Sequence, residues 1–71
     1  MTLTLLQQFY NECLKALFKG TPFPKAKSPN ERDMLNDFRT TMSQFHRAKW
    51  NEEAADIGAE YGLDTELLVT L

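Results

Sequence analysis

The chain has 71 residues, of which 42% are hydrophobic and 25% charged, and its formal net charge at pH 7 is −2. This composition is typical of a folded globular protein and excludes a disordered chain. The length allows one domain, over residues 1–71, whose core lies near the lower limit of independent stability. The opening apolar run has no basic segment before it and is interrupted by Gln7, Gln8 and Asn11, so we expect neither a signal peptide nor a membrane span.

The first predicted helix covers residues 5–19. Thr4 followed by Gln7 has the form of a capping box, in which each side chain would accept the backbone N–H of the other residue. Gly20 can adopt the left-handed conformation that closes a helix, and Lys19 suits the negative end of the helix dipole. The buried stripe expected at 3.6 residues per turn consists of Leu6, Phe9, Tyr10, Cys13, Leu14, Leu17 and Phe18.

A proline-containing loop at residues 20–28 is expected to lead into a second helix at 29–48. Pro22 and Pro24 disfavour helical geometry in the loop. The start of the second helix is marked by a capping side chain, a proline at the first helical position and an acidic residue two positions later, namely Ser28, Pro29 and Glu31. The predicted buried stripe of this helix is Met34, Leu35, Phe38, Met42 and Phe45.

Two shorter helices are predicted after residue 50. The first covers 52–61, with Asn51 as its cap and Gly62 as its end, and buries Ala54, Ile57, Gly58 and Tyr61. The second covers 65–71. The sequence therefore predicts an all-α fold, a small orthogonal bundle of three to four helices.

The residues that carry chemistry do not form a catalytic or cofactor-binding arrangement in the sequence. His46 is the only histidine and Cys13 the only cysteine, so neither a Cys/His zinc set nor a paired nucleophile and base is indicated. No glycine-rich phosphate loop or EF-hand loop occurs. We therefore expect no enzyme, no cofactor and no metal site. A lone cysteine without a disulfide partner favours a cytoplasmic setting.

Charge is divided sharply along the chain. All eight basic residues lie within 15–49, so residues 1–50 have a net charge of +4, whereas 51–71 have a net charge of −6. Such asymmetry points to charged partners or charged self-association, although two patches that cover each other within the fold would also explain it. The candidate basic patch is Lys15, Lys19, Lys25 and Lys27. The candidate acidic face is Glu52, Glu53, Asp56 and Glu60.

The spacing of small and apolar residues near the C-terminal end resembles the core of a helix-turn-helix, through Ile57, Gly58, Gly62, Leu63 and Leu68. A recognition helix offers basic or amide side chains to DNA, whereas residues 64–71 are acidic and then apolar. We therefore interpret the spacing as a packing corner. Nucleic acid is disfavoured as a partner, and a DNA-binding regulator that uses the basic first half is kept as the alternative hypothesis.

The sequence favours a small regulatory or adaptor protein that acts by protein–protein interaction. Its apolar end has almost no polar cover, which is typical either of an interface or of core. The expected partner is another protein, and a second copy of this chain is one candidate, in which the acidic face of one copy would lie near Lys25 and Lys27 of the other. Besides the acidic face, the candidate partner-binding residues are Trp50, Tyr61, Leu67, Leu68 and Leu71.

Overall fold

A computed structural model describes residues 4–65 of the chain. It contains helix α1 (Leu5–Lys19), helix α2 (Pro29–Gln44), the short 3-10 helix η1 (Arg47–Lys49) and helix α3 (Trp50–Glu60). No strand occurs among the described residues. The predicted small all-α bundle is confirmed. The expected last helix, at 65–71, lies from residue 66 onward outside the described residues.

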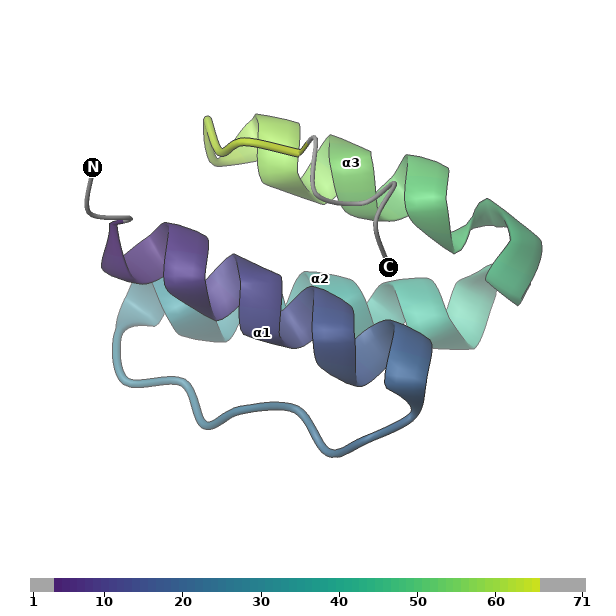
Figure 1. The fold of residues 1–71 in the computed structure, drawn as a ribbon, viewed down its shortest axis with the longest axis horizontal. Coiled ribbons are helices and arrows are strands. Elements are labelled where there is room, and N and C mark those ends of the chain that lie inside the picture. Colours follow the sequence, from purple (N-terminus) through teal and green to yellow (C-terminus); the bar gives the residue numbers. More distant parts are fainter. Residues whose placement is uncertain (1–3, 66–71) are drawn as a thin grey trace.

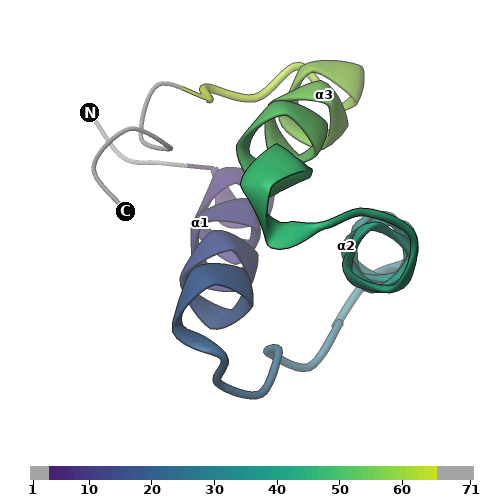
Figure 2. The same cartoon turned by 90° about the vertical axis from the view of Figure 1, so that its right-hand side faces the viewer.

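The three α-helices enclose the core from three sides. Helices α1 and α2 run in the same direction along the molecule, and the loop at residues 20–28 returns along its length to connect them (Figure 1). Helix α3 then runs back in the opposite direction. Seen along the long axis, α1, α2 and α3 lie at the corners of a triangle (Figure 2).

The bounds of α1 agree with the prediction. At its start, the Thr4 side chain accepts a hydrogen bond from the Gln7 backbone N–H at 3.0 Å. At its end, Gly20 has a φ of 74°, and the backbone N–H groups of Gly20 and Thr21 both donate to the Ala16 carbonyl oxygen, at 2.9 and 3.1 Å. A left-handed glycine at this position satisfies a carbonyl that the helix itself leaves free.

Helix α2 begins as predicted but ends at Gln44, so the expected bound of residue 48 is wrong. The hydroxyl of Thr41 donates to the Asp37 carbonyl oxygen at 2.9 Å, and that of Ser43 donates to the Thr40 carbonyl oxygen at 3.0 Å. Hydroxyl bonds of this kind compete with the helical ladder. Phe45 is then extended, with φ −119° and ψ 147°.

The buried face of α2 differs from the prediction at two positions, Met42 and Phe45. Phe45 lies beyond the end of the helix and is only half-buried. Met42 was expected in the core but is 42% exposed, whereas Thr41 is only 5% exposed. Thr41 can occupy a buried position because its hydroxyl is already satisfied by the backbone of its own helix.

Helix α3 begins at Trp50, two residues before the predicted start, because η1 leads directly into it. The predicted cap, Asn51, therefore lies inside the helix. Lys49 occupies the cap position instead and makes no side-chain capping bond. The helix ends at Glu60, one residue before the predicted bound, and the glycine closure predicted for this end is present. Leu63 N–H donates to the Gly58 carbonyl oxygen at 2.9 Å, and Gly62 has a φ of 70°.

The core is one cluster to which all three α-helices contribute. The rings of Tyr10 and Phe38 pack with their centroids 5.7 Å apart, and the hydroxyl of Tyr10 donates to the Ala54 carbonyl oxygen at 2.7 Å. The buried members are Phe9, Tyr10, Cys13, Leu14, Leu17, Met34, Leu35, Phe38, Ala54 and Ile57. Within residues 4–65, none of the helices has the length and apolar character needed to cross a membrane.

Candidate functional site

A groove of about 710 Å³ lies between α1 and the loop that precedes α2. Ligand-binding pockets have volumes of roughly 300–1,000 Å³, and this groove lies within that range. Its lining combines apolar and charged side chains. They are Leu5, Gln8, Phe9, Asn11, Glu12 and Lys15 from α1, Pro24, Lys25, Lys27 and Ser28 from the loop, and Glu31 from α2.

The apolar part of the groove begins in the first turn of α1. Leu5 is 77% exposed, which is unusual for a large apolar side chain in this molecule. Phe9 lies one turn further along the same face and is mostly buried, and Pro24 approaches from the loop and is half-buried. Leu5 and the half-buried Pro24 therefore supply the exposed apolar surface of the groove, whereas Phe9, at 7% exposed, adds little to it.

The two carboxylates that line the groove are already engaged within the chain. An oxygen of Glu12 lies 3.7 Å from the ammonium nitrogen of Lys15, one turn along α1. A carboxylate oxygen of Glu31 accepts a hydrogen bond from the backbone N–H of Lys27 at 2.9 Å, and the Glu31 backbone N–H donates to Ser28 Oγ at 3.2 Å. The loop is thereby fixed against the start of α2.

The loop lysines differ from Lys15 in their charge partners. Lys25 and Lys27 are both exposed. In the part of the chain that the structure describes, no carboxylate lies within ion-pair distance of either ammonium group, since the single ion pair there joins Glu12 and Lys15. The loop wall therefore carries two positive charges that are not neutralised by contact.

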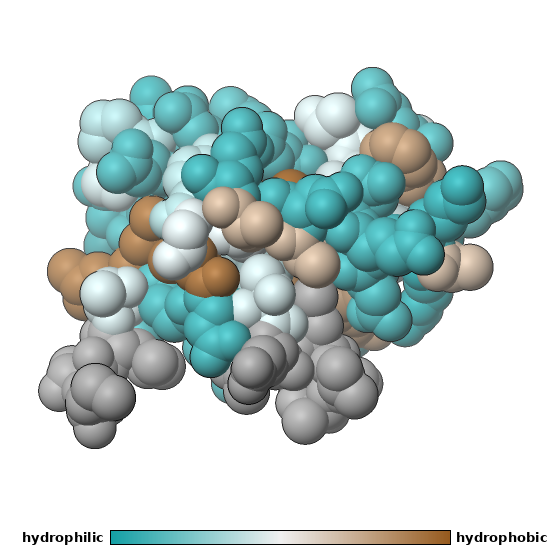
Figure 3. Space-filling view, turned by 90° about the horizontal axis from the view of Figure 1, so that it is seen from above, coloured by the Kyte–Doolittle hydropathy of each residue, from teal (hydrophilic) through white to brown (hydrophobic). Residues whose placement is uncertain are grey.

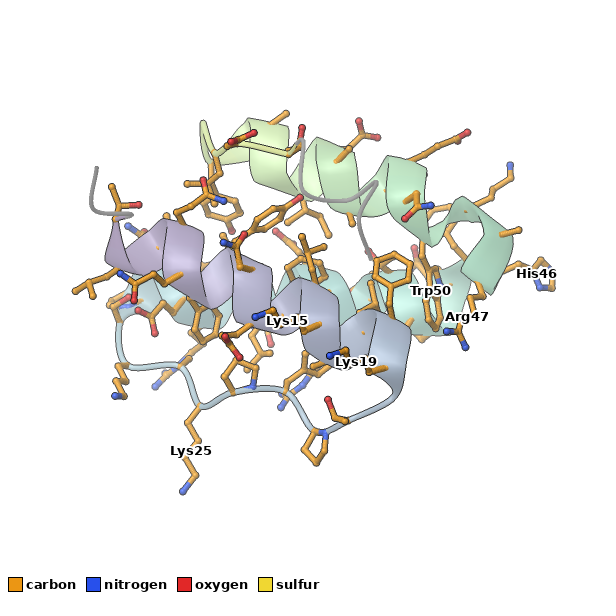
Figure 4. All side chains as sticks on the ribbon, viewed as in Figure 1. Lys15, Lys19, Lys25, His46, Arg47 and Trp50 are labelled. Carbon is orange, nitrogen blue, oxygen red and sulfur yellow. The ribbon has the colours of Figure 1, made fainter. Side chains whose placement is uncertain are left out.

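The structure brings three of the four predicted basic residues to one site. Lys15, Lys25 and Lys27 line the groove, whereas Lys19 does not. Figure 4 shows Lys15 and Lys19 along α1, with Lys25 projecting from the loop below them. The patch is therefore divided between a groove and the last turn of α1.

The predicted acidic residues share α3, on the side of the bundle away from the loop (Figure 1). Glu52, Asp56 and Glu60 are exposed, and Glu53 is half-buried. Seen from the α3 side, hydrophilic side chains cover most of the surface (Figure 3). None of these acids forms an ion pair with a described basic residue. The positive and negative surfaces therefore lie apart and do not cover each other.

Trp50, predicted as an anchor for a partner, is engaged within the fold. Its ring meets the ring of Phe18 edge-on, with centroids 6.1 Å apart, and the Arg47 guanidinium lies 5.8 Å from its centroid. Its indole N–H donates to the Phe45 carbonyl oxygen at 2.9 Å. The half-buried ring thus stabilises the corner between α2 and α3.

Tyr61, the second predicted anchor, donates its hydroxyl to a carboxylate oxygen of Asp37 at 3.2 Å. Burial and the charge of Asp37 raise the pKa of Tyr61 to about 12. This contact joins the end of α3 to α2. The predicted interface leucines, Leu67, Leu68 and Leu71, lie outside the described residues.

Neither Cys13 nor His46 belongs to the groove. Cys13 is fully buried, and burial raises the pKa of its thiol to about 12, so the reactive thiolate is not populated near neutral pH. His46 is exposed at the far end of the molecule (Figure 4). Within residues 4–65, no three His, Cys, Asp or Glu side chains gather closely enough to hold a metal ion.

Leu5 and Pro24 were not singled out from the sequence, although Leu5 offered a usable signal. It lies beyond the edge of the apolar stripe that begins at Leu6, and a large apolar residue off the stripe faces solvent unless another element covers it. Pro24 could not be placed from the sequence, because its position depends on the path of the loop.

Comparison with known proteins gives no relative for this chain. No protein-family model matches it, and no match was found among the curated proteins or among the solved structures. Its function must therefore be inferred from its own surface.

Proposed function

We propose that this chain is a small non-enzymatic regulator or adaptor that acts by binding another protein. The observation that carries the proposal is the groove between α1 and the loop, which offers the exposed Leu5 beside the unpaired Lys25 and Lys27. Protein interfaces combine an apolar centre with a polar or charged rim in this way. The apolar part supplies affinity, and the charged rim supplies orientation and speed of association.

A nucleic acid suits this surface less well. Binding to a phosphate backbone depends on several cationic side chains that neutralise successive phosphates. Here the carboxylates of Glu12 and Glu31 lie in the same groove as the lysines, and the formal net charge of the chain is −2. A DNA-binding regulator remains the alternative, and it predicts binding to duplex DNA that weakens steeply as salt rises.

The test is an affinity capture with the full chain and two double variants. The groove variant, Lys25→Glu/Lys27→Glu, reverses two charges beside the groove. The control, Arg39→Glu/Lys49→Glu, makes the same change in net charge at two exposed positions that do not line it. A partner protein retained by the wild type and the control but lost by the groove variant supports the proposal.

Two results contradict the proposal. The first is a chain that retains no protein under conditions in which circular dichroism shows it to be folded. The second is salt-dependent binding of nonspecific duplex DNA that the groove variant abolishes and the control does not, which favours the DNA-binding alternative. Both measurements use the same three proteins, and circular dichroism of each shows whether a variant has lost its fold.

A further inference from the structure

We infer that the groove between α1 and the loop binds a short acidic segment of a partner protein that carries an apolar side chain between its carboxylates. This inference rests on the proposed function and names the occupant of the same groove. The segment would place its apolar side chain on Leu5 and Pro24 and direct its carboxylates toward Lys25 and Lys27. The volume of about 710 Å³ suits a segment of a few residues.

The apolar requirement follows from the exposure of Leu5. Covering an exposed leucine side chain removes apolar surface from water, and this is the main favourable term in most protein associations. Among the described residues, Leu5 and Met42 are the only large hydrophobic side chains that are exposed. Of these two, Leu5 alone lines a groove with further apolar side chains beside it.

The acidic requirement follows because the carboxylates of the groove have partners within the chain, whereas two of its lysines have no charge partner among the described residues. Glu31 accepts the backbone N–H of Lys27, and Glu12 is paired with Lys15, so both carboxylates are compensated within the chain. Lys25 and Lys27 are left to interact with a ligand. An occupant with carboxylates at this wall gains attraction, whereas a basic occupant is repelled.

Neither α3 nor the surroundings of Met42 in a second copy offers this combination. The exposed residues of α3 supply carboxylates but no large apolar side chain, since they are Asn51, Glu52, Asp56, Ala59 and Glu60. Met42 is exposed on α2, but the residues three and four positions before it on the helix, Arg39 and Phe38, are not acidic. A partner segment that carries both carboxylates and a large apolar side chain therefore fits the groove better than the α3 face or the Met42 surface of a second copy.

The experiment is a titration of the full-length ¹⁵N-labelled chain with three capped synthetic peptides, followed by backbone amide chemical shifts. The first peptide is Glu-Asp-Leu-Asp-Glu. In the second, Gln-Asn-Leu-Asn-Gln, amides replace the acids, and in the third, Glu-Asp-Ser-Asp-Glu, serine replaces the leucine. We expect the first peptide to shift the amides of Leu5, Phe9 and 25–28, and each of the other two to bind about fivefold or more weakly.

Three variants locate the binding. Lys25→Glu/Lys27→Glu is expected to weaken the first peptide about tenfold or more, because two attractions become repulsions. Leu5→Ser is expected to weaken it about fivefold. The control Arg39→Glu/Lys49→Glu has the same net charge as the first variant and is expected to change binding less than about twofold.

Other occupants have their own signatures, and each overturns the inference. If dilution of the free chain shifts the amides of Leu5 and Lys25, the occupant of the groove is a second copy of the chain. If the substitution Leu67→Ser/Leu68→Ser in the full-length chain causes the same shifts before any peptide is added, the occupant of the groove is the chain's own C-terminal segment. Equal binding of the amide peptide, shifts confined to α3, or no shift at millimolar peptide would also overturn it. In each case the proposed function stands or falls separately, on whether a protein is captured.

Discussion

The side-chain amide of Gln7 pairs with both backbone polar groups of Asp64. Its Oε1 accepts from the Asp64 N–H at 2.8 Å, and its Nε2 donates to the Asp64 carbonyl oxygen at 3.1 Å and to Asn11 Oδ1 at 3.1 Å. Gln7 is only 6% exposed, although it belongs to a polar residue type. The pair joins positions 57 residues apart and holds the segment after α3 against α1.

Replacing Gln7 with leucine should therefore destabilise the fold. The substitution keeps a side chain of similar size but leaves the N–H and carbonyl oxygen of Asp64 without these bonds, which costs about 1–3 kcal/mol. Urea unfolding followed by circular dichroism measures the difference. The control Gln44→Leu, at an exposed position of α2, should change the free energy of unfolding by less than about 0.5 kcal/mol. Equal stability of the two variants would show that the Gln7 pair contributes nothing.

A close approach of Tyr10 to Gly58 provides a second prediction. A Cβ atom at Gly58 would lie 2.6 Å from the Tyr10 hydroxyl oxygen and 2.6 Å from Thr65 Cγ2. Gly58→Ala should destabilise the chain, because overpacking costs about 1–3 kcal/mol, whereas the gain in helix propensity is about 1 kcal/mol. Thermal or urea unfolding measures the net loss.

The double variant with Tyr10→Phe tests the cause of that loss. Tyr10→Phe alone removes the bond to the Ala54 carbonyl oxygen and should cost about 1 kcal/mol. It also removes the hydroxyl oxygen that the new methyl group would meet, but it keeps the ring carbon Cζ, 2.7 Å from the new Cβ, so the relief is partial. The two losses should therefore add to more than the loss of the double variant. Strict additivity would mean that the strain of Gly58→Ala arises at the retained ring carbon Cζ or at Thr65 Cγ2 and not at the hydroxyl oxygen.

The starts of α1 and α2 and the glycine closures were predictable because their signals are local, whereas the start of α3, which follows η1 without a side-chain cap, was predicted two residues late. Thr4, Ser28 and Gly20 act on backbone groups within a few residues, so the sequence spacing alone determines their partners. The end of α2 was predicted wrongly. No glycine or proline marks the stop, and Phe45, which follows it in extended geometry, has its carbonyl oxygen bound by the indole N–H of Trp50, five residues further along the chain.

The groove and the Gln7 pair depend on tertiary structure. Gln7 was expected to complete a capping box with Thr4, but its side chain binds Asp64 instead, which no local rule could identify. The basic residues were recognised from the sequence as a group. Which of them share a site was decided by the loop, which returns along α1 and brings Lys25 and Lys27 beside Lys15.

Stability should fall at alkaline pH because two buried groups resist ionisation. Burial, reinforced by the charges of Glu31 and Glu12, raises the pKa of the Cys13 thiol from 9.0 to about 12. Burial, reinforced by the charge of Asp64, raises the pKa of Tyr10 from 10.0 to about 12. The unfolded chain therefore loses these protons first, so their contribution to stability is complete below pH 9 and is lost as pH rises toward about 12.

Urea unfolding at about pH 8 and about pH 10.5 measures this loss, and the variant Cys13→Ala isolates the part due to the thiol. Cys13→Ala is less stable than the wild type at the lower pH, because it leaves a small cavity. Between the two pH values, however, Cys13→Ala should lose less stability than the wild type, because it has no thiol to ionise. An identical loss in both proteins would mean that the thiol ionises as readily in the fold as in the unfolded chain.

Arg47 links η1 to the end of α1, and its removal should be measurable at Trp50. Its guanidinium donates to the Phe18 carbonyl oxygen at 2.6 Å and lies 5.8 Å from the Trp50 ring centroid. A cation at a helix C-terminal end is favourable, and contact with an exposed aromatic face adds about 0.5–1 kcal/mol. Arg47→Gln should therefore destabilise the fold by about 1 kcal/mol and alter the fluorescence of Trp50, the only tryptophan.

The control for this prediction is Arg39→Gln, which removes the same charge from an exposed position of α2. It should leave the emission of Trp50 unchanged and shift stability by less than about 0.5 kcal/mol. Arg47→Lys separates charge from geometry, because lysine keeps the positive charge but lacks the planar donor group that stacks on a ring. If Arg47→Lys matches the wild type in both stability and emission, a positive charge at this position is sufficient, and the planar guanidinium itself contributes little.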